Sequence, residues 1–325
     1  MKLPHRRQFL HLAGGAAALL PASRFGWAQA YPTRPITMIV PAGPGSAFDT
    51  SARIVADRMR GSLKQPIIVE NIPGADGNLA TSRVARARPD GYTIIQGSNS
   101  THVLNAALYS LPYDVLNDFV PISPVVMIPS ALFAKKTMQA KDLHELIAWL
   151  KANPNKASVA FTLGGNHVLS AYFQKETATQ FTLVPYRGAV IQDLMAGQID
   201  LYISNVTYLP LVRAGSIKAC AVTSDRRLEI APDIPTFAEL GLPTMSRSGW
   251  TGLFAPKGTS KEIISSLNAA VVDALADPAV RSRLVDFGTE IFPPERRTPE
   301  ALRALQKSDA EKWWPIIKAA NIRAE

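Results

Sequence analysis

The sequence predicts an α/β fold of two lobes, each built of βαβ units, with the chain crossing twice between them. Short apolar strands alternate with amphipathic helices through most of the chain after residue 30. Two apolar, strand-like runs, at 125–133 and 250–254, stand where the chain would cross. The C-terminal part is mostly helical and buries its apolar faces best against the first lobe. We therefore expect one lobe from 31–127 with 251–325 and the other from 128–250.

The first thirty residues have the pattern of an export signal. Arg6-Arg7 is followed by an apolar run, Leu12–Leu20, and Ala28-Gln29-Ala30 provides a small-x-small cleavage site. This order is typical of a bacterial twin-arginine signal peptide. A membrane anchor is the alternative, but the apolar run is well short of the roughly 20 residues that a spanning helix needs. The pattern predicts residues 1–30 as a cleaved signal and the periplasm as the destination.

The first strand and helix show why each element is expected where it is. An apolar run at 36–40 precedes a Gly/Pro loop, after which Ala52, Val55 and Met59 share one helix face. Ser46, with Asp49 three residues later, resembles a capping box at the helix start. The same alternation predicts strands at 36–40, 67–70, 92–96, 125–128, 131–133, 158–161, 183–186, 200–204, 217–222 and 250–254, and helices at 47–63, 79–87, 103–108, 141–151, 168–177, 190–196, 208–214, 261–275, 279–287 and 299–320.

Composition argues against several classes of function. The formal net charge is +9, and removing the four basic residues of the signal leaves 31 basic and 26 acidic residues, a net of +5. These charges are scattered, so we expect no nucleic-acid partner. Cys220 is the only cysteine, which allows no intramolecular disulfide, and it is expected in a buried strand. No HExxH, CxxC or GxSxG motif is present, so we expect no metal, no cofactor and no enzymatic activity.

Small or glycine residues recur between a predicted strand and a predicted helix. They are found at 43–49, 98–102, 164–167, 188 and 205–207. In parallel α/β sheets such loops meet at one edge, where the first N–H groups of each helix are free to bind an anion. Any one loop could equally be an ordinary tight turn. The first loop lacks the GK[ST] ending of a phosphate loop, and Pro44 removes one donor. The set therefore favours a carboxylate site in a cleft between lobes.

Some side chains in these loops have two interpretations. Asp49 either caps its helix or accepts a hydrogen bond from a ligand. His167 either donates to an anion or packs in the interior. Tyr186 follows a strand and could border the site, and with Phe48 and Tyr208 it forms either an apolar pocket wall or ordinary core. The sequence does not choose between these roles.

Several motifs occur in order along the chain after the signal: Val40-Pro41 with Gly43-Pro44-Gly45, Pro73-Gly74-Ala75, Pro89-Asp90-Gly91-Tyr92, Leu111-Pro112-Tyr113-Asp114 and Gly197-Gln198-Ile199-Asp200. Through these residues the chain resembles the Bug-type periplasmic receptors of tripartite tricarboxylate transporters, and the resemblance covers nearly all of the chain after the signal.

The resemblance implies a Venus-flytrap binding protein, with the two-lobed periplasmic-binding-protein architecture, that captures a small carboxylate and passes it to membrane transporter subunits. It implies a monomer that does not enter the membrane after signal cleavage. A ligand-presenting sensor for a membrane histidine kinase is the alternative, and aromatic, di-, tricarboxylic and amino acids all remain open as ligands. The resemblance and the loops together predict a set of ligand-binding residues: Gly45, Ser46, Ala47, Phe48, Asp49, Ser100, Thr101, His102, Gly164, Gly165, Asn166, His167, Tyr186, Gly188 and Asn205.

Overall fold

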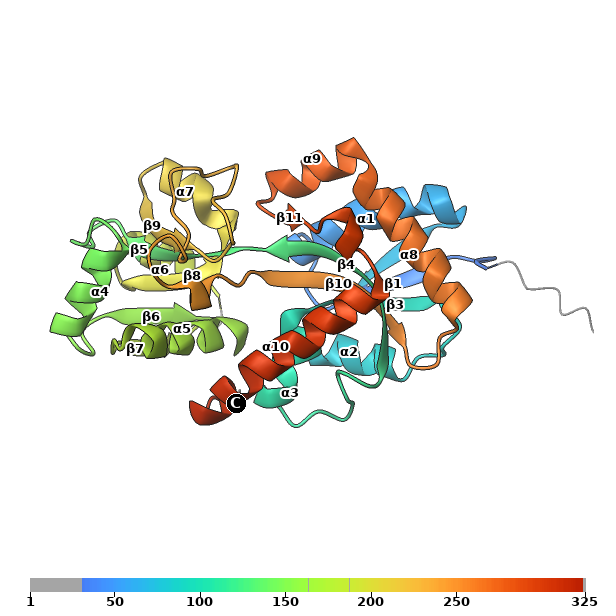
Figure 1. Ribbon diagram of the computed structural model, residues 1–325, viewed down its shortest axis with the longest axis horizontal. Coiled ribbons are helices and arrows are strands. Elements are labelled where there is room, and N and C mark those ends of the chain that lie inside the picture. The colour runs from blue at the N-terminus through green and yellow to red at the C-terminus, as the bar shows by residue number, and fades with distance from the viewer. Residues whose placement is uncertain (1–30, 163, 187, 324–325) are drawn as a thin grey trace, which may run out of the picture. The chain divides into compact units, whose positions relative to one another are not determined.

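The computed structural model describes residues 31–162, 164–186 and 188–323 (Figure 1). The predicted signal peptide, 1–30, lies outside the described residues. Pro32–Glu325 belong to one compact unit, and this unit contains two separate β-sheets. The division of the chain into lobes at 127/128 and 250/251 remains a prediction.

The first sheet has six strands in the order β11-β4-β10-β3-β1-β2. The strands β1, β2 and β3 are parallel, whereas β10 runs antiparallel to β3 and β4, and β11 antiparallel to β4. The sheet is thus mixed. The strand β4 leads the chain to the second sheet and β10 brings it back, and these two strands pair with each other inside the first sheet. The bounds are β1 Ile36–Val40, β2 Ile67–Asn71, β3 Thr93–Ser98, β4 Phe119–Ile128, β10 Gly249–Pro256 and β11 Glu290–Ile291.

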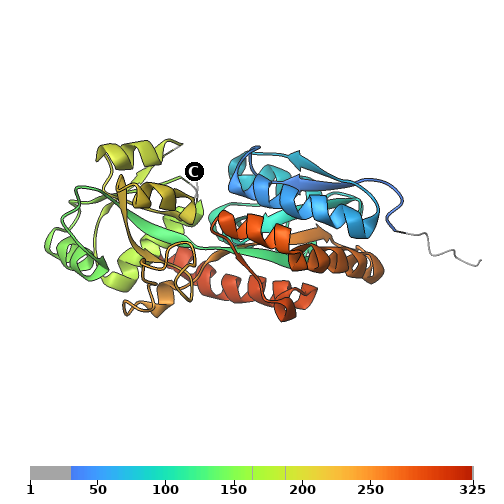
Figure 2. The same cartoon turned by 90° about the horizontal axis from the view of Figure 1, so that it is seen from above.

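The second sheet has five strands in the order β7-β6-β8-β5-β9. The strand β6 is parallel to β7 and β8, and β5 is antiparallel to β8 and β9. The chain passes from β4 to β5 at Pro129, so that these strands run from one sheet to the other in both views (Figures 1 and 2). It returns through 223–248 to β10. The bounds are β5 Ser130–Lys135, β6 Ser158–Phe161, β7 Thr182–Pro185, β8 Leu201–Asn205 and β9 Ile217–Val222.

Helices flank both sheets, and α8 and α10 pack against β4 of the first sheet. Contacts join α8 to α1 and β4, and α10 to β4. No single helix in the described residues is long and apolar enough to cross a membrane, although the bent pair α8 and α9 passes this test jointly. The bounds are α1 Ala47–Leu63, α2 Asn78–Ala85, α3 Asn105–Leu108, α4 Leu143–Ala152, α5 Gly164–Thr177, α6 Val190–Ala196, α7 Leu209–Arg213, α8 Lys261–Ala276, α9 Pro278–Asp286 and α10 Pro299–Ala319.

Two predicted loops are in fact regular structure. Ser98 ends β3, and Ser100–Leu104 form a turn of π-helix that leads directly into α3. The helix α5 begins at Gly164, so the residues 164–167 form its first turn and do not precede it. Small and hydroxyl side chains are poor signals of where a loop ends, because they occur in turns and in first helical turns alike.

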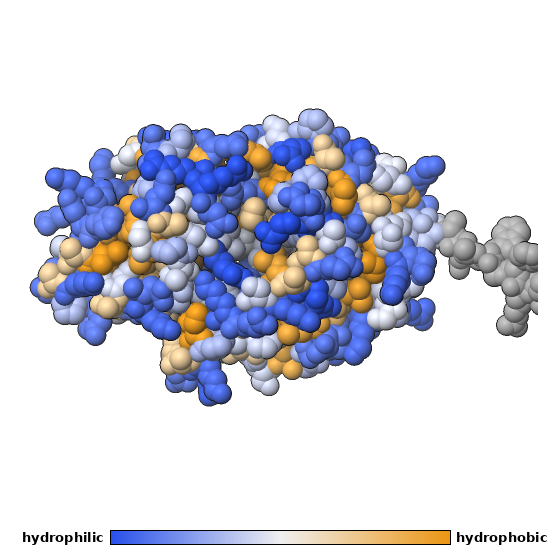
Figure 3. Space-filling view, viewed as in Figure 1, coloured by the Kyte–Doolittle hydropathy of each residue, from blue (hydrophilic) through white to orange (hydrophobic). Residues whose placement is uncertain are grey.

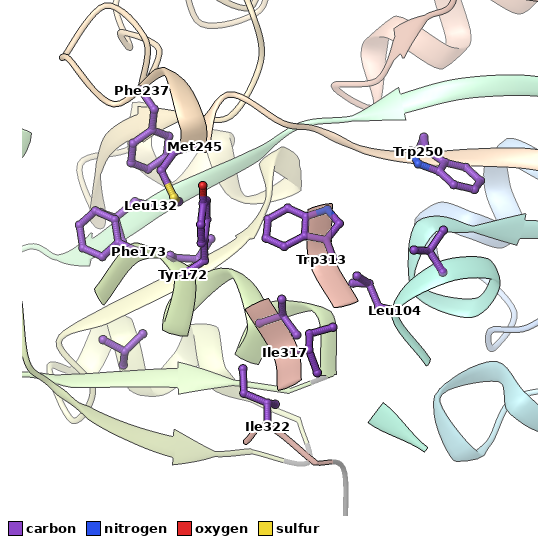
Figure 4. Packing of buried hydrophobic residues seen from close by; sticks show 14 of the residues in the cluster. Leu104, Leu132, Tyr172, Phe173, Phe237, Met245, Trp250, Trp313, Ile317 and Ile322 are labelled. Atoms are coloured by element: carbon purple, nitrogen blue, oxygen red, sulfur yellow. The ribbon is translucent and has the colours of Figure 1, made fainter. Parts of the chain in front are cut away.

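The helix α10 contacts elements of both sheets. Trp313 packs on Tyr172 of α5 with ring centroids 5.2 Å apart, whereas the neighbouring Trp314 donates from Nε1 to the carbonyl of Val103 at 2.9 Å. Figure 4 shows Trp313 between Tyr172 and Leu104. This apolar cluster therefore joins the two halves of the unit, which are the part around the first sheet and the part around the second sheet. The face of Figure 1 is mostly hydrophilic, with small separate apolar patches (Figure 3).

Candidate functional site

A cavity of about 300 Å³ lies between the two sheets, where several segments of the chain come together. The first turn of α1 and the π-helical turn after β3 border it from the first sheet. The first turn of α5 and the end of β8 border it from the second. Its wall consists of Phe48, Asn99, Ser100, Leu104, Ile128, Ser130, Thr162, Gly165, Asn166, Val168, Leu169, Tyr202, Ser204, Asn205, Tyr208, Arg247, Gly249, Trp250 and Trp313.

The first turn of α1 has two N–H groups without an acceptor inside the helix, on Ala47 and Phe48. The side chain of Ser46 caps the helix by accepting from the N–H of Asp49 at 3.2 Å. The N–H groups of Ala47 and Phe48 precede the first intrahelical bond and keep no acceptor within the helix. They carry the partial positive charge of the helix end, which suits an anion.

Asp49 itself serves the structure of the loop. Its carboxylate is 3% exposed and accepts from the N–H of Gly45 at 2.9 Å, from Nε of Arg53 at 2.9 Å and from the amide of Asn71 at 2.9 Å. Burial acts to raise the pKa of Asp49, but the hydrogen bonds from Arg53, Gly45 and Asn71 outweigh it, so the pKa lies below its usual value. With both oxygens engaged, Asp49 holds the loop in place.

The first turn of α5 is the corresponding feature of the second sheet. Gly164 donates its N–H to Oδ2 of Asp76 at 3.5 Å, across the two halves of the unit. Gly165 and Asn166 line the cavity, and the side chain of Asn166 donates to the hydroxyl of Tyr202 at 3.4 Å. A Cβ on Gly165 would lie 3.1 Å from Oγ of Ser100. A larger side chain at Gly165 would therefore press against Ser100 across the two halves of the unit.

Of the predicted residues, Phe48, Ser100, Gly165, Asn166 and Asn205 line the cavity. Gly45 and Ala47 line a neighbouring cavity of about 500 Å³, whose wall also includes Asn205 and Tyr208, so that the two cavities adjoin. The predicted residues on α1, in the turn after β3, on α5 and at the end of β8 thus lie around adjoining cavities.

Other predicted residues point their side chains elsewhere. His102 is fully buried, with its ring stacked on Phe254 at 4.1 Å and Nδ1 2.9 Å from Oγ1 of the buried Thr101. His167 stacks on Phe161 with ring centroids 4.3 Å apart, which realises the packed alternative. Burial lowers the pKa of both histidines.

The segment after β7 is also turned away from the cavity wall. The Tyr186 hydroxyl donates to Oδ2 of Asp193 at 2.8 Å, and this pair belongs to the surface of α6. Gly188 has a φ of +152° and faces open space. Neither residue is among those that line the cavity.

Sequence reasoning missed the wall formed by Arg247, Trp250 and Trp313. Arg247 lies in the irregular return segment before β10, and Trp313 is 63 positions after Trp250, so no local pattern links them. A larger cavity, of about 820 Å³, borders Arg247 and Trp250 and extends along β11 and α10. In the described part of the chain, no group of three or more His, Cys, Asp or Glu side chains is arranged to hold a metal ion.

The fold is shared with solved periplasmic binding proteins, such as BugD, which is 33% identical with a TM-score of 0.78 over 91% of this chain and 100% of that chain. The family model of the tripartite tricarboxylate transporter family receptor matches residues 51–322. BugT of Bordetella pertussis is 35% identical over 322 residues, which span 97% of this chain and 96% of BugT. The chain belongs to this receptor family, which favours the transport interpretation over the sensor alternative.

Solved structures agree with this assignment. MatC from Rhodopseudomonas palustris, with bound malate, is 36% identical and superimposes with a TM-score of 0.78 over 88% of this chain and 100% of MatC. An R. palustris protein with adipate is 30% identical, with a TM-score of 0.80 over 90% of this chain and 99% of that chain. The predicted two-lobed periplasmic-binding-protein fold is confirmed.

Proposed function

We propose that this chain is a periplasmic solute-binding protein that captures a small carboxylate and delivers it to the membrane subunits of a tripartite tricarboxylate-type transporter. The observation that carries the proposal is the cavity where the first turns of α1 and α5 meet. The chain reaches the periplasm through a twin-arginine signal at 1–30 and acts as a monomer. It needs no cofactor, because capture and release break no covalent bond.

The ligand carboxylate binds to N–H groups of the two helix starts. Ala47 and Phe48 supply donors from α1, and Gly165 and Asn166 supply them from α5. A charged acceptor makes such hydrogen bonds about twice as strong as neutral ones. Because the donors belong to different halves of the unit, a bound carboxylate favours the arrangement in which the halves are close. Relatives with bound malate and adipate support this class of ligand.

A substitution at Gly165 tests the proposal. A valine there would place its side chain against Oγ of Ser100, 3.1 Å from the added Cβ, and would fill the cavity next to the N–H donors. We expect Gly165→Val to weaken carboxylate binding by more than about tenfold, measured by isothermal titration calorimetry. Gly43→Val is the matched control, because a Cβ on Gly43 meets nothing within 4 Å. Equal affinity in both folded variants would refute the proposed site.

A further inference from the structure

Arg247 is the one residue with a charged side chain among the described residues that line the 300 Å³ cavity. It lies in the segment that returns from the second sheet to β10, far from the helix starts in the sequence. The rest of the wall is apolar, aromatic or neutral and polar. A guanidinium in such a wall favours a ligand with a strong hydrogen-bond acceptor, because a buried acidic group needs a charged or multiply hydrogen-bonding partner. The charge of Arg247 is itself paired with Asp309, so it offers the ligand directed hydrogen bonds.

Two residues of α10, Ser308 and Asp309, hold the guanidinium in place. Its Nε donates to Oδ1 of Asp309 at 2.6 Å, and its Nη2 donates to Oγ of Ser308 at 3.1 Å. Asp309 is 1% exposed, and its second oxygen accepts from Nε1 of Trp250 at 2.7 Å. Both oxygens of Asp309 are thus engaged. These bonds use Nε and Nη2, so the two N–H groups on Nη1 are free to bind a further acceptor.

The shape and chemistry of the wall indicate what that acceptor is. Five aromatic side chains line the cavity together with the guanidinium: Phe48, Tyr202, Tyr208, Trp250 and Trp313. Trp250 is 2% exposed and Trp313 is 5% exposed, so these rings form a fixed apolar boundary. A small molecule whose body lies along them, with one carboxylate at the helix starts, would present its other end to Arg247.

We propose that Arg247 is a specificity-determining residue that binds a second acidic group of the ligand, so that the preferred ligand is a small diacid with an apolar body. This inference rests on the proposed function, which supplies the first carboxylate. The planar guanidinium matches a carboxylate, and the Asp309 contact fixes its orientation before the ligand arrives, which reduces the entropy lost on binding.

The test compares a diacid with its own half-amide, which has nearly the same shape and one acidic group fewer. Adipate with its monoamide and terephthalate with its monoamide are the probes, and titration calorimetry is the readout. We expect the protein to bind at least one diacid about 10- to 100-fold more tightly than its half-amide, since a hydrogen bond to a charged group has about this effect. The double variant Arg247→Gln with Asp309→Asn should lose this preference and bind the half-amide within about threefold of the original affinity.

Two further variants separate recognition from structure. Asp309→Asn alone keeps the guanidinium and should retain the diacid preference. Arg247→Lys keeps the charge beside Asp309 but not the planar fork, and should reduce the preference even if the double variant does not fold. A diacid preference that persists in the folded double variant, or that Arg247→Lys leaves unchanged, would overturn the role of Arg247 while carboxylate binding stands. Failure of every acid to bind the unaltered protein would overturn the proposed function, and this inference with it.

Discussion

The burial of His102 predicts a specific dependence of stability on pH. Burial first, and then the positive charge of Arg303, lowers the pKa of His102 from 6.5 to about 3 in the folded protein. As the pH falls, His102 therefore binds a proton near pH 6.5 in the unfolded chain but only near pH 3 in the folded protein. Between these values the unfolded state holds more protons, so the free energy of unfolding falls as the pH falls.

The size of the effect follows from the two pKa values. At pH 5, 1.5 units below 6.5, protonation of the unfolded histidine lowers the free energy of unfolding by about 2 kcal/mol relative to pH 8. The full span of 3.5 units corresponds to about 5 kcal/mol at acid pH. His102→Leu removes the titrating group. Its contribution to the pH dependence of the free energy of unfolding should therefore disappear, whatever the stability of the variant at pH 8.

Urea unfolding at pH 8, 7, 6 and 5 measures the difference. The free energy of unfolding of the unaltered protein should decrease by about 2 kcal/mol more between pH 8 and pH 5 than that of His102→Leu. His144→Gln is the control for the loss of an imidazole, because this histidine is exposed on α4. Parallel curves for the unaltered protein and His102→Leu would refute the argument that His102 is neutral and buried.

Two other predictions concern packing and reactivity. Gly97→Ala would place a Cβ 2.3 Å from Nδ1 of the buried His102, so we expect the free energy of unfolding in urea to fall by about 1–3 kcal/mol. Gly43→Ala is the control and should change stability little, because its Cβ meets nothing within 4 Å. Equal stabilities of the two variants would contradict the packing around His102. Cys220 is half-buried in β9 and not fully buried as expected, and desolvation raises the pKa of its thiol to about 12. A thiol reagent at pH 8 should therefore label Cys220 far more slowly in the folded protein than after unfolding, and equal labelling rates would contradict this.

The sequence predicted elements well where local and tertiary signals agree. The helix α1 runs from Ala47 to Leu63 as expected, because the Ser46 cap and the apolar stripe specify the same start and the same face. The strands Ile36–Val40, Ser158–Phe161 and Ile217–Val222 also have their predicted bounds. Each is a short apolar run with turn residues at both ends, which leaves few alternatives.

The mixed pairing of both sheets was not predicted. An apolar strand has the same pattern whether its neighbours are parallel or antiparallel, and only the path of the chain decides. The crossing strands β4, β5 and β10 are antiparallel to their neighbours because they lead from one sheet to the other. The π-helical turn at Ser100–Leu104 likewise depends on packing around the buried His102, which no local motif reports.

The cavity could be predicted in part. Residues after β1 and β3 of the first sheet gave Phe48 and Ser100, and residues after β6 and at the end of β8 of the second gave Gly165 and Asn205, because parallel strands bring such segments to one edge of each sheet. Arg247 has no such position: it lies in an irregular segment, and its contacts with Ser308 and Asp309 on α10 hold its side chain in the wall. A site residue that is fixed by tertiary contacts alone leaves no periodicity or spacing in the sequence.

The central claim is that the helix starts bind a carboxylate, and the most direct measurement is a thermal-shift screen of the mature protein. The panel contains mono-, di- and tricarboxylates, aromatic acids and acidic amino acids, each paired with its amide. At about 100 times its dissociation constant, a ligand should stabilise the folded protein by about 2.7 kcal/mol. We expect a raised melting temperature with at least one acid and not with its amide. A shift with a sugar, nucleotide or cation, and with no acid, would contradict it.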